Sequence, residues 1–221
     1  MKHQQSGFTL VEIAIVLVII GLLLGGVLKG QELINSAKAK TYAQDFRTIQ
    51  SALYAFQDRF KGIPGDLAGA DTKITGATPA TTPANSVGNG QISGVWDSTT
   101  ATDESCLVWQ HLRLAGFLAG STANNCAAGN IYLQTNADGG RVGLSSTVPI
   151  TAMTGTYFIC SAGVVGKTAK QLDLQLDDGN TATGSFRVTD QNLSPPTAAA
   201  TAAKATGEVL DATAYTVCLA F

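Results

Sequence analysis

The sequence predicts an α+β protein in which a long N-terminal helix packs on a small antiparallel β-sheet head. An apolar run from Phe8 to Leu28 continues into an amphipathic stripe, and several short β-prone segments follow in the second half of the chain. The 221 residues suit one domain plus an attachment segment. Only 14% of the residues are charged and the net charge is −2, which excludes a basic nucleic-acid-binding protein and a charged disordered chain.

The charges are divided unequally along the chain. Through Lys61 there are seven basic and four acidic residues, a net charge of +3, and beyond Lys61 there are seven basic and twelve acidic residues, a net charge of −5. Phosphate backbones would repel this acidic second part. We therefore expect no nucleic acid among the partners of the protein.

Residues 8–28 are the most apolar segment and contain one charge, Glu12. About 20 apolar residues are enough to cross the core of a bilayer as a helix. A secretory signal peptide has a shorter apolar stretch, of about 7–15 residues, followed by a small-residue cleavage site, and neither feature is present here. The segment is therefore predicted to be the transmembrane half of a helix that is retained.

Beyond Lys29, large apolar residues recur at alternating intervals of four and three, as expected on one face of a helix. They are Tyr42, Phe46, Ile49, Leu53, Phe56 and Phe60. This spacing predicts an amphipathic stalk over residues 29–61, so that one helix can run from Phe8 to about Phe60. The apolar stripe of the stalk must then be buried against the head.

Glu12 is a carboxylate inside the predicted membrane segment, where an ionisable residue is a functional-site candidate that needs a cationic partner. Cleavage between Gly7 and Phe8 would create such a partner, the α-amine of Phe8. The alternative interpretation is that Glu12 lies at the level of the lipid headgroups and has no such role.

The short leader MKHQQSG, followed by FTLVE at residues 8–12, resembles the class III leader of the type IV pilin and type II secretion pseudopilin superfamily. The resemblance implies that residues 1–7 are a leader removed after Gly7 by a prepilin peptidase, which also acts as the N-methyltransferase that makes Phe8 an N-methylphenylalanine. It implies that Glu12 neutralises the Phe8 amine of a neighbouring pilin-like subunit during assembly, and that the fold is pilin-like.

The resemblance also implies a location and a set of partners. The prepilin would be a single-pass protein of the bacterial inner membrane, with a cytoplasmic leader and a periplasmic head, and would enter a pilus or pseudopilus filament through an inner-membrane assembly platform. Lys29 stands near where major pilins usually carry a proline, which favours a minor pilin or a type II secretion pseudopilin. The alternative is a singly anchored envelope binding module that does not polymerise.

Residues 62–221 are expected to form the periplasmic or extracellular globular head. The sequence predicts a long surface loop over 68–105, a helix from the N-cap Asp103 to about Ala115, and a low-complexity loop over 194–206. Strands are predicted at 130–134, 155–160, 185–189 and 214–218. Residues 169–176 fit either a strand or a helix face, and the resemblance to pilins favours a short helix.

All four cysteines follow the membrane segment, so we expect disulfides, for which three pairings are possible. We prefer Cys106–Cys126, which closes a local helix–loop turn, together with Cys160–Cys218. The second bond would join two strands near the C-terminus, much as pilins fasten their C-terminal region. A zinc site is not expected because no C-x2-C pair is present.

Few other residues suggest chemistry, and no catalytic motif is present, so we do not expect an enzyme. Residues 161–168 end in Gly-Lys-Thr like a phosphate-binding loop but begin with Ser161, so a polar turn is the preferred interpretation. Asp177, Asp178 and Asn180 are candidate calcium ligands, although their spacing favours a solvated turn. His111 lies on an apolar stripe and is expected to be packed.

Overall fold

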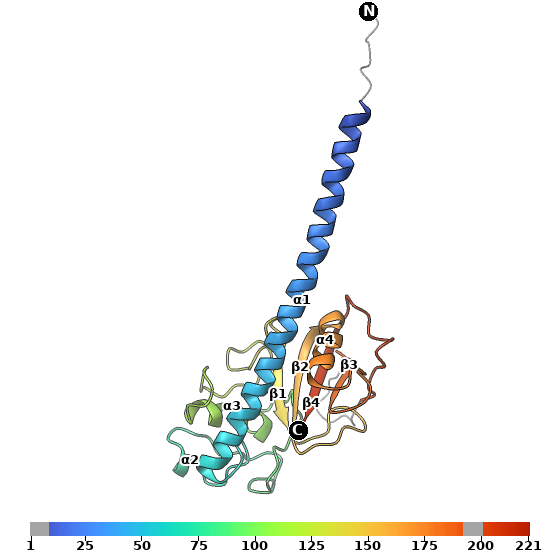
Figure 1. Ribbon diagram of the computed structural model, residues 1–221. Helices are drawn as coiled ribbons and strands as arrows, with labels where there is room; N and C mark the ends of the chain where they lie inside the picture. Colours follow the sequence, from blue (N-terminus) through green and yellow to red (C-terminus); the bar gives the residue numbers. More distant parts are fainter. Residues whose placement is uncertain (1–8, 192–200) are drawn as a thin grey trace, which may run out of the picture. The chain divides into compact units, whose positions relative to one another are not determined.

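The computed structural model describes residues 9–191 and 201–221, and it has the α+β architecture that the sequence predicts. Four helices and four strands follow one another in the described residues (Figure 1). Their bounds are α1 Leu10–Phe60, α2 Ala70–Lys73, α3 Glu104–Leu114, β1 Val142–Ser145, β2 Phe158–Val165, α4 Gly166–Leu176, β3 Phe186–Asp190 and β4 Ala214–Ala220. The chain divides into two units, Met1–Ala37 and Lys38–Phe221.

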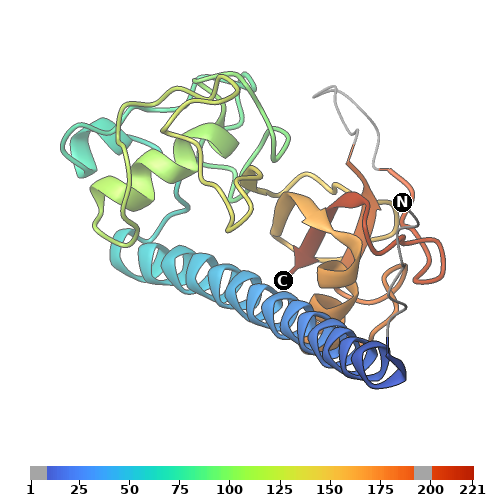
Figure 2. The ribbon, with the colours of Figure 1, turned by 90° about the horizontal axis from the view of Figure 1, so that it is seen from above.

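The predicted long helix is present as α1, which is 51 residues long. No proline interrupts it before Pro64. In the second unit, the predicted stripe of α1 is buried from Tyr42 to Phe56 and packs in the main core with α3 and one face of the sheet (Figure 2). Phe60, the last residue of the helix, is partly buried against this core.

The four strands form one antiparallel sheet in the order β1-β2-β4-β3. Successive side chains of a strand point to opposite faces, so Ile159 packs in the main core while Phe158 and Cys160 pack in a second cluster with Trp96 and Ile150. Both faces of the sheet are therefore covered. This explains why β1 is buried at every residue instead of alternating between buried and exposed positions.

Within the described residues, the structure lacks one predicted strand and contains one that was not predicted. Residues 130–134 form no strand; Tyr132 is instead buried in a loop beneath α3, where its hydroxyl donates to the Cys106 carbonyl at 2.6 Å. Strand β1 was not predicted, because VGLS contains too few β-branched or aromatic residues to be recognised. Gly143 is required there, since a Cβ atom would lie 2.0 Å from the carbonyl oxygen of Trp96.

The strand predicted at 155–160 begins later and ends later, at Phe158 and Val165. Residues 161–168 are therefore not the predicted polar turn but the end of β2, with an irregularity between Ser161 and Val164, and the start of α4. The strands predicted at 185–189 and 214–218 correspond to β3 and β4, and the ambiguous segment 169–176 is helical. Part of the predicted low-complexity loop, residues 194–200, lies outside the described residues.

The segment 68–105, predicted as a surface loop, contributes to the core. It contains α2, and its Ile92 side chain is fully buried. Two buried carboxylates organise it: Asp66 accepts backbone N–H groups from Gly88, Asn89 and Gly90, and Glu104 accepts from Ser86 and Ser93. The sequence conceals this because isolated apolar residues among glycine and threonine have no periodicity.

Asp103 occupies the N-cap position of α3, as predicted, but it makes no capping hydrogen bond to the helix. Its carboxylate accepts hydrogen bonds from the hydroxyls of Thr82 and Ser98 instead. The helix ends close to the predicted position: its C-cap is Ala115, and the next residue, Gly116, adopts a φ of 81°, a conformation typical of the residue after a helix C-cap.

Candidate functional site

The first described residues of the N-terminal segment form a capping box. The carboxylate of Glu12 accepts hydrogen bonds from the backbone N–H and from the hydroxyl of Thr9, both at 2.8 Å, and the Glu12 N–H donates to the Thr9 hydroxyl at 3.3 Å. This reciprocal arrangement stabilises the start of a helix. Glu12 thus has a local role in α1, besides any role between subunits. The predicted cleavage residues Gly7 and Phe8 lie outside the described residues.

The part of α1 that follows Glu12 is apolar and unburied around its whole circumference. Among the described residues, α1 is the one helix that is long and apolar enough to cross a membrane, and none of its most apolar stretch is buried. Every residue from Leu10 to Leu28 is exposed. A helix that is apolar on all faces needs an apolar environment, either lipid or other helices.

A family model identifies this segment. The match is to the "Prokaryotic N-terminal methylation motif", and it covers residues 2–28. The chain carries the class III signal of type IV pilins and pseudopilins. The motif indicates a type IV pilin-like or pseudopilin prepilin, and it implies processing by a prepilin peptidase, association with other pilin subunits and a structural role.

The match ends at Leu28, so it describes the signal and the apolar part of α1 but not the head. Searches of curated proteins and of solved structures found no match to the chain. Any assignment to the head therefore depends on its own residues.

The second unit contains two disulfides, Cys106–Cys126 and Cys160–Cys218, which are the pairs preferred from the sequence. Cys106 lies on α3 and Cys126 in the loop that follows it. Cys160 and Cys218 are directly opposite each other on β2 and β4. Each bond closes a long stretch of chain, and bonds of this kind typically stabilise a domain by about 2–4 kcal/mol.

The Gly-Lys-Thr segment does not provide a phosphate site. Helix α4 begins at Gly166, but the first backbone N–H groups are already bonded: Gly166 donates to the Thr213 carbonyl at 2.8 Å and Lys167 to the Asp211 carbonyl at 3.2 Å. A phosphate-binding loop needs such groups free to point at the ligand.

His111 is fully buried on α3, as its place on the apolar stripe predicts. Its Nδ1 accepts the Gly65 N–H at 2.9 Å, and its Nε2 lies 2.9 Å from the Thr78 carbonyl. Burial lowers the pKa of the imidazole. With both nitrogens bonded to the backbone, His111 fastens two loops to α3 and has no free nitrogen for proton transfer.

The calcium candidates are only partly brought together. Asp177 and Asp178 lie at the C-terminal end of α4 and are joined there by Asp173, one turn earlier, with one carboxylate oxygen of each within 4.8 Å of the others. Asn180 does not belong to this group, and its side-chain oxygen accepts the Ala182 N–H at 3.3 Å. Sequence reasoning missed Asp173, although its spacing of four residues from Asp177 on a helix was a usable signal.

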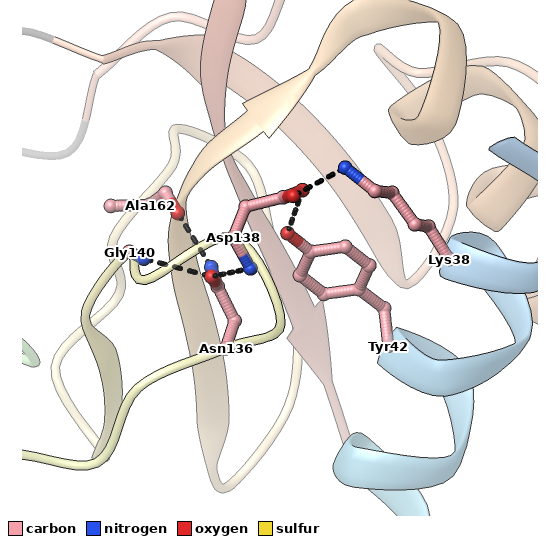
Figure 3. Close-up of polar contacts among 6 residues, drawn as sticks. All are labelled: Lys38, Tyr42, Asn136, Asp138, Gly140 and Ala162. Carbon is pink, nitrogen blue, oxygen red and sulfur yellow. Dashed lines mark hydrogen bonds and ion pairs between the residues drawn. The ribbon is translucent and has the colours of Figure 1, made fainter. Parts of the chain in front are cut away.

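A polar cluster in the second unit joins the loop 135–140 to α1 (Figure 3). The carboxylate of Asp138 accepts two hydrogen bonds from α1, one from the ammonium of Lys38 at 2.5 Å and one from the hydroxyl of Tyr42 at 2.8 Å. Asn136 shapes the loop, because its side-chain oxygen accepts the N–H groups of Asp138 and Gly140 and its amide donates to the Ala162 carbonyl. The sequence contains no signal for this cluster, since its partners lie about a hundred residues apart.

Proposed function

We propose that this protein is a structural or assembly subunit of a type IV pilus or pilus-like filament, and more specifically a minor pilin or type II secretion pseudopilin. It enters the inner membrane as a prepilin, is cleaved after Gly7, is N-methylated at Phe8 and polymerises through its N-terminal helix. The methylation motif over residues 2–28, continuous with the unburied apolar part of α1, carries the proposal.

The physical basis is an exchange of environments. The same apolar surface of α1 is covered by lipid before assembly and by the helices of neighbouring subunits afterwards. A charge pair between Glu12 and the Phe8 amine of a neighbour is costly to break in an apolar environment, so it can set the position of one subunit along the next. The proposal includes a cytoplasmic leader and a periplasmic head.

The first test replaces Gly7 and Glu12 and follows processing and assembly separately. Gly7→Ala should leave the leader attached, as measured by the mass of the protein, whereas the mature wild type should begin with N-methyl-Phe8. Glu12→Gln should be processed normally but fail to enter filaments or support secretion. A glutamine at this position keeps the capping box and removes only the charge.

Thr9→Ala is the matched control for Glu12→Gln. It removes the hydroxyl that bonds to Glu12, at a cost of about 1 kcal/mol in capping, and keeps the carboxylate. We expect this variant to assemble. If Glu12→Gln assembles like the wild type, or if the leader is removed from Gly7→Ala, the subunit proposal is wrong and the protein is a singly anchored envelope binding module.

A further inference from the structure

The C-terminal end of α4 concentrates three carboxylates, and no cationic side chain among the described residues forms an ion pair with them. Asp173, Asp177 and Asp178 converge there, as described above, and the exposed helix carbonyls add the negative end of the helix dipole.

The nearby cations make their direct contacts outside the cluster, although the pKa of Asp178 is lowered by the hydrogen bond from the Asn180 N–H first and, at a distance, also by the charge of Arg187. Lys170 on α4 pairs with Asp211 at 2.8 Å, and Lys204 pairs with Asp190 at 3.2 Å. Arg187 on β3 donates to the carbonyls of Gly184 and Thr151.

Asp173 differs from the two other acids because it is fully buried. Neither of its carboxylate oxygens has a hydrogen-bond partner among the described residues. Burial first, and then the charges of Asp178 and Asp177, raise the pKa of Asp173 to about 7, and the backbone N–H of Gly179 opposes this rise without completing a hydrogen bond. A buried carboxylate that accepts no hydrogen bond is costly, so this group needs a ligand or a proton.

The two other carboxylates are already oriented by the loop between α4 and β3. Asp177 accepts the Phe186 N–H at 2.8 Å, and Asp178 accepts the Asn180 N–H at 2.8 Å and the Thr183 hydroxyl at 2.9 Å. These bonds hold the carboxylates beside Asp173, with Asp177 half-buried and Asp178 exposed. One side of the group therefore meets solvent, from which an ion can enter.

We propose that Asp173, Asp177 and Asp178 bind a hard divalent cation, which fastens the end of α4 to the start of β3. Carboxylate oxygens are the ligands that Ca²⁺ prefers, and Ca²⁺ accepts the irregular arrangement of a helix end and a loop more readily than Mg²⁺ does. The proposal concerns the head alone, so it stands or falls independently of filament assembly.

The experiment uses the full-length protein in detergent micelles and measures Ca²⁺ binding by calorimetry and thermal unfolding in Ca²⁺ and in EGTA. Ca²⁺ should raise the unfolding midpoint saturably, with half-saturation on the order of 10⁻⁴–10⁻³ M, the range of extracellular calcium modules. Asp173→Asn and Asp178→Asn should each weaken binding by about tenfold or more, because each removes one of three charged ligands.

Asp211→Asn is the matched control. It removes an acid that faces the same helix through Lys170 but lies outside the cluster, so it should keep the full response to Ca²⁺. If it loses the response as Asp173→Asn does, the binding is general surface acidity and the proposal is wrong. A different result would also contradict the proposal: the wild type unfolds at the same temperature in Ca²⁺ and in EGTA, and Asp173→Asn unfolds at a higher temperature than the wild type. Asp173 would then carry a proton, and no cation site would exist.

Discussion

Among single residues, Asp138 shows how one side chain can secure a loop to a helix. Burial alone would raise the pKa of Asp138, but the hydrogen bonds from Lys38 and Tyr42 outweigh it, and the pKa is lowered. Desolvation, followed by the hydrogen bond to Asp138, raises the pKa of Tyr42, so the phenol stays protonated and keeps donating. The cluster is therefore complete only while Asp138 is ionised.

This arrangement predicts a loss of stability in acid. A carboxyl group whose pKa is lower in the folded state contributes stability above its unfolded pKa of about 3.9, and the contribution disappears as the pH falls through the folded pKa. The side chains of Lys38 and Asp138 are both partly exposed, so we expect their ion pair to contribute about 1 kcal/mol or less. Asp138→Asn should lose this amount at neutral pH and show a shallower decline of unfolding free energy below about pH 4.

The measurement is urea unfolding across this pH range, with Asp58→Asn as the control. The pKa of Asp58 is also lowered, by its ion pair with Lys61, but both side chains are exposed, so we expect this variant to change the pH profile much less than Asp138→Asn does. An Asp138→Asn protein with the pH profile of the wild type would show that the cluster makes no electrostatic contribution.

Among the elements, α4 is the one whose type the sequence left open between strand and helix. In a strand, Leu172, Leu174 and Leu176 would share one face. In the helix, Leu172 faces the core and is fully buried, whereas Leu174 is 70% exposed. Helical burial of Ala169 and Leu172 against the sheet thus decides between two patterns that local sequence supports equally.

The two leucines form a matched pair for a test of this element. Leu172→Ala should lower the free energy of unfolding by about 2–5 kcal/mol, since it removes a fully packed side chain. Leu174→Ala should change it by no more than about 0.5 kcal/mol. Similar losses for both variants, measured by chemical unfolding of the full chain, would contradict the helical assignment.

At the scale of the whole molecule, the positions of the disulfides and of the exposed apolar residues indicate which compartment suits each unit. Disulfides persist in oxidising compartments, and all four cysteines lie in the second unit. The continuous run of exposed apolar residues lies in the first unit, over Leu10–Leu28. Together these features support a membrane-anchored prepilin whose head is exported.

This orientation predicts the outcome of protease treatment. Protease added to spheroplasts should digest the head, at the latest once the disulfides are reduced. An epitope placed before Met1 on the uncleaved Gly7→Ala variant should remain protected until the membrane is permeabilised. Digestion of the epitope in sealed cells would reverse the proposed orientation.

The sequence alone determined the extent of α1, because an apolar run and a stripe of spacing three and four are properties of adjacent residues. It also determined the methylation signal, whose residues are contiguous. Strands β3 and β4 were recognisable for the same reason, since their β-branched and aromatic residues lie within a few positions of one another.

Only the tertiary structure decided which distant groups meet. Strand β1 exists because its backbone pairs with β2, not because VGLS favours an extended chain. Ile92 is buried through contacts with distant segments, and Lys38 meets Asp138 across 100 positions. The spacing of Asp173 and Asp177 is local, but only the packing shows that the carboxylate of Asp173 is buried. Burial and long-range contact depend on the whole fold, and no local pattern in the sequence records them.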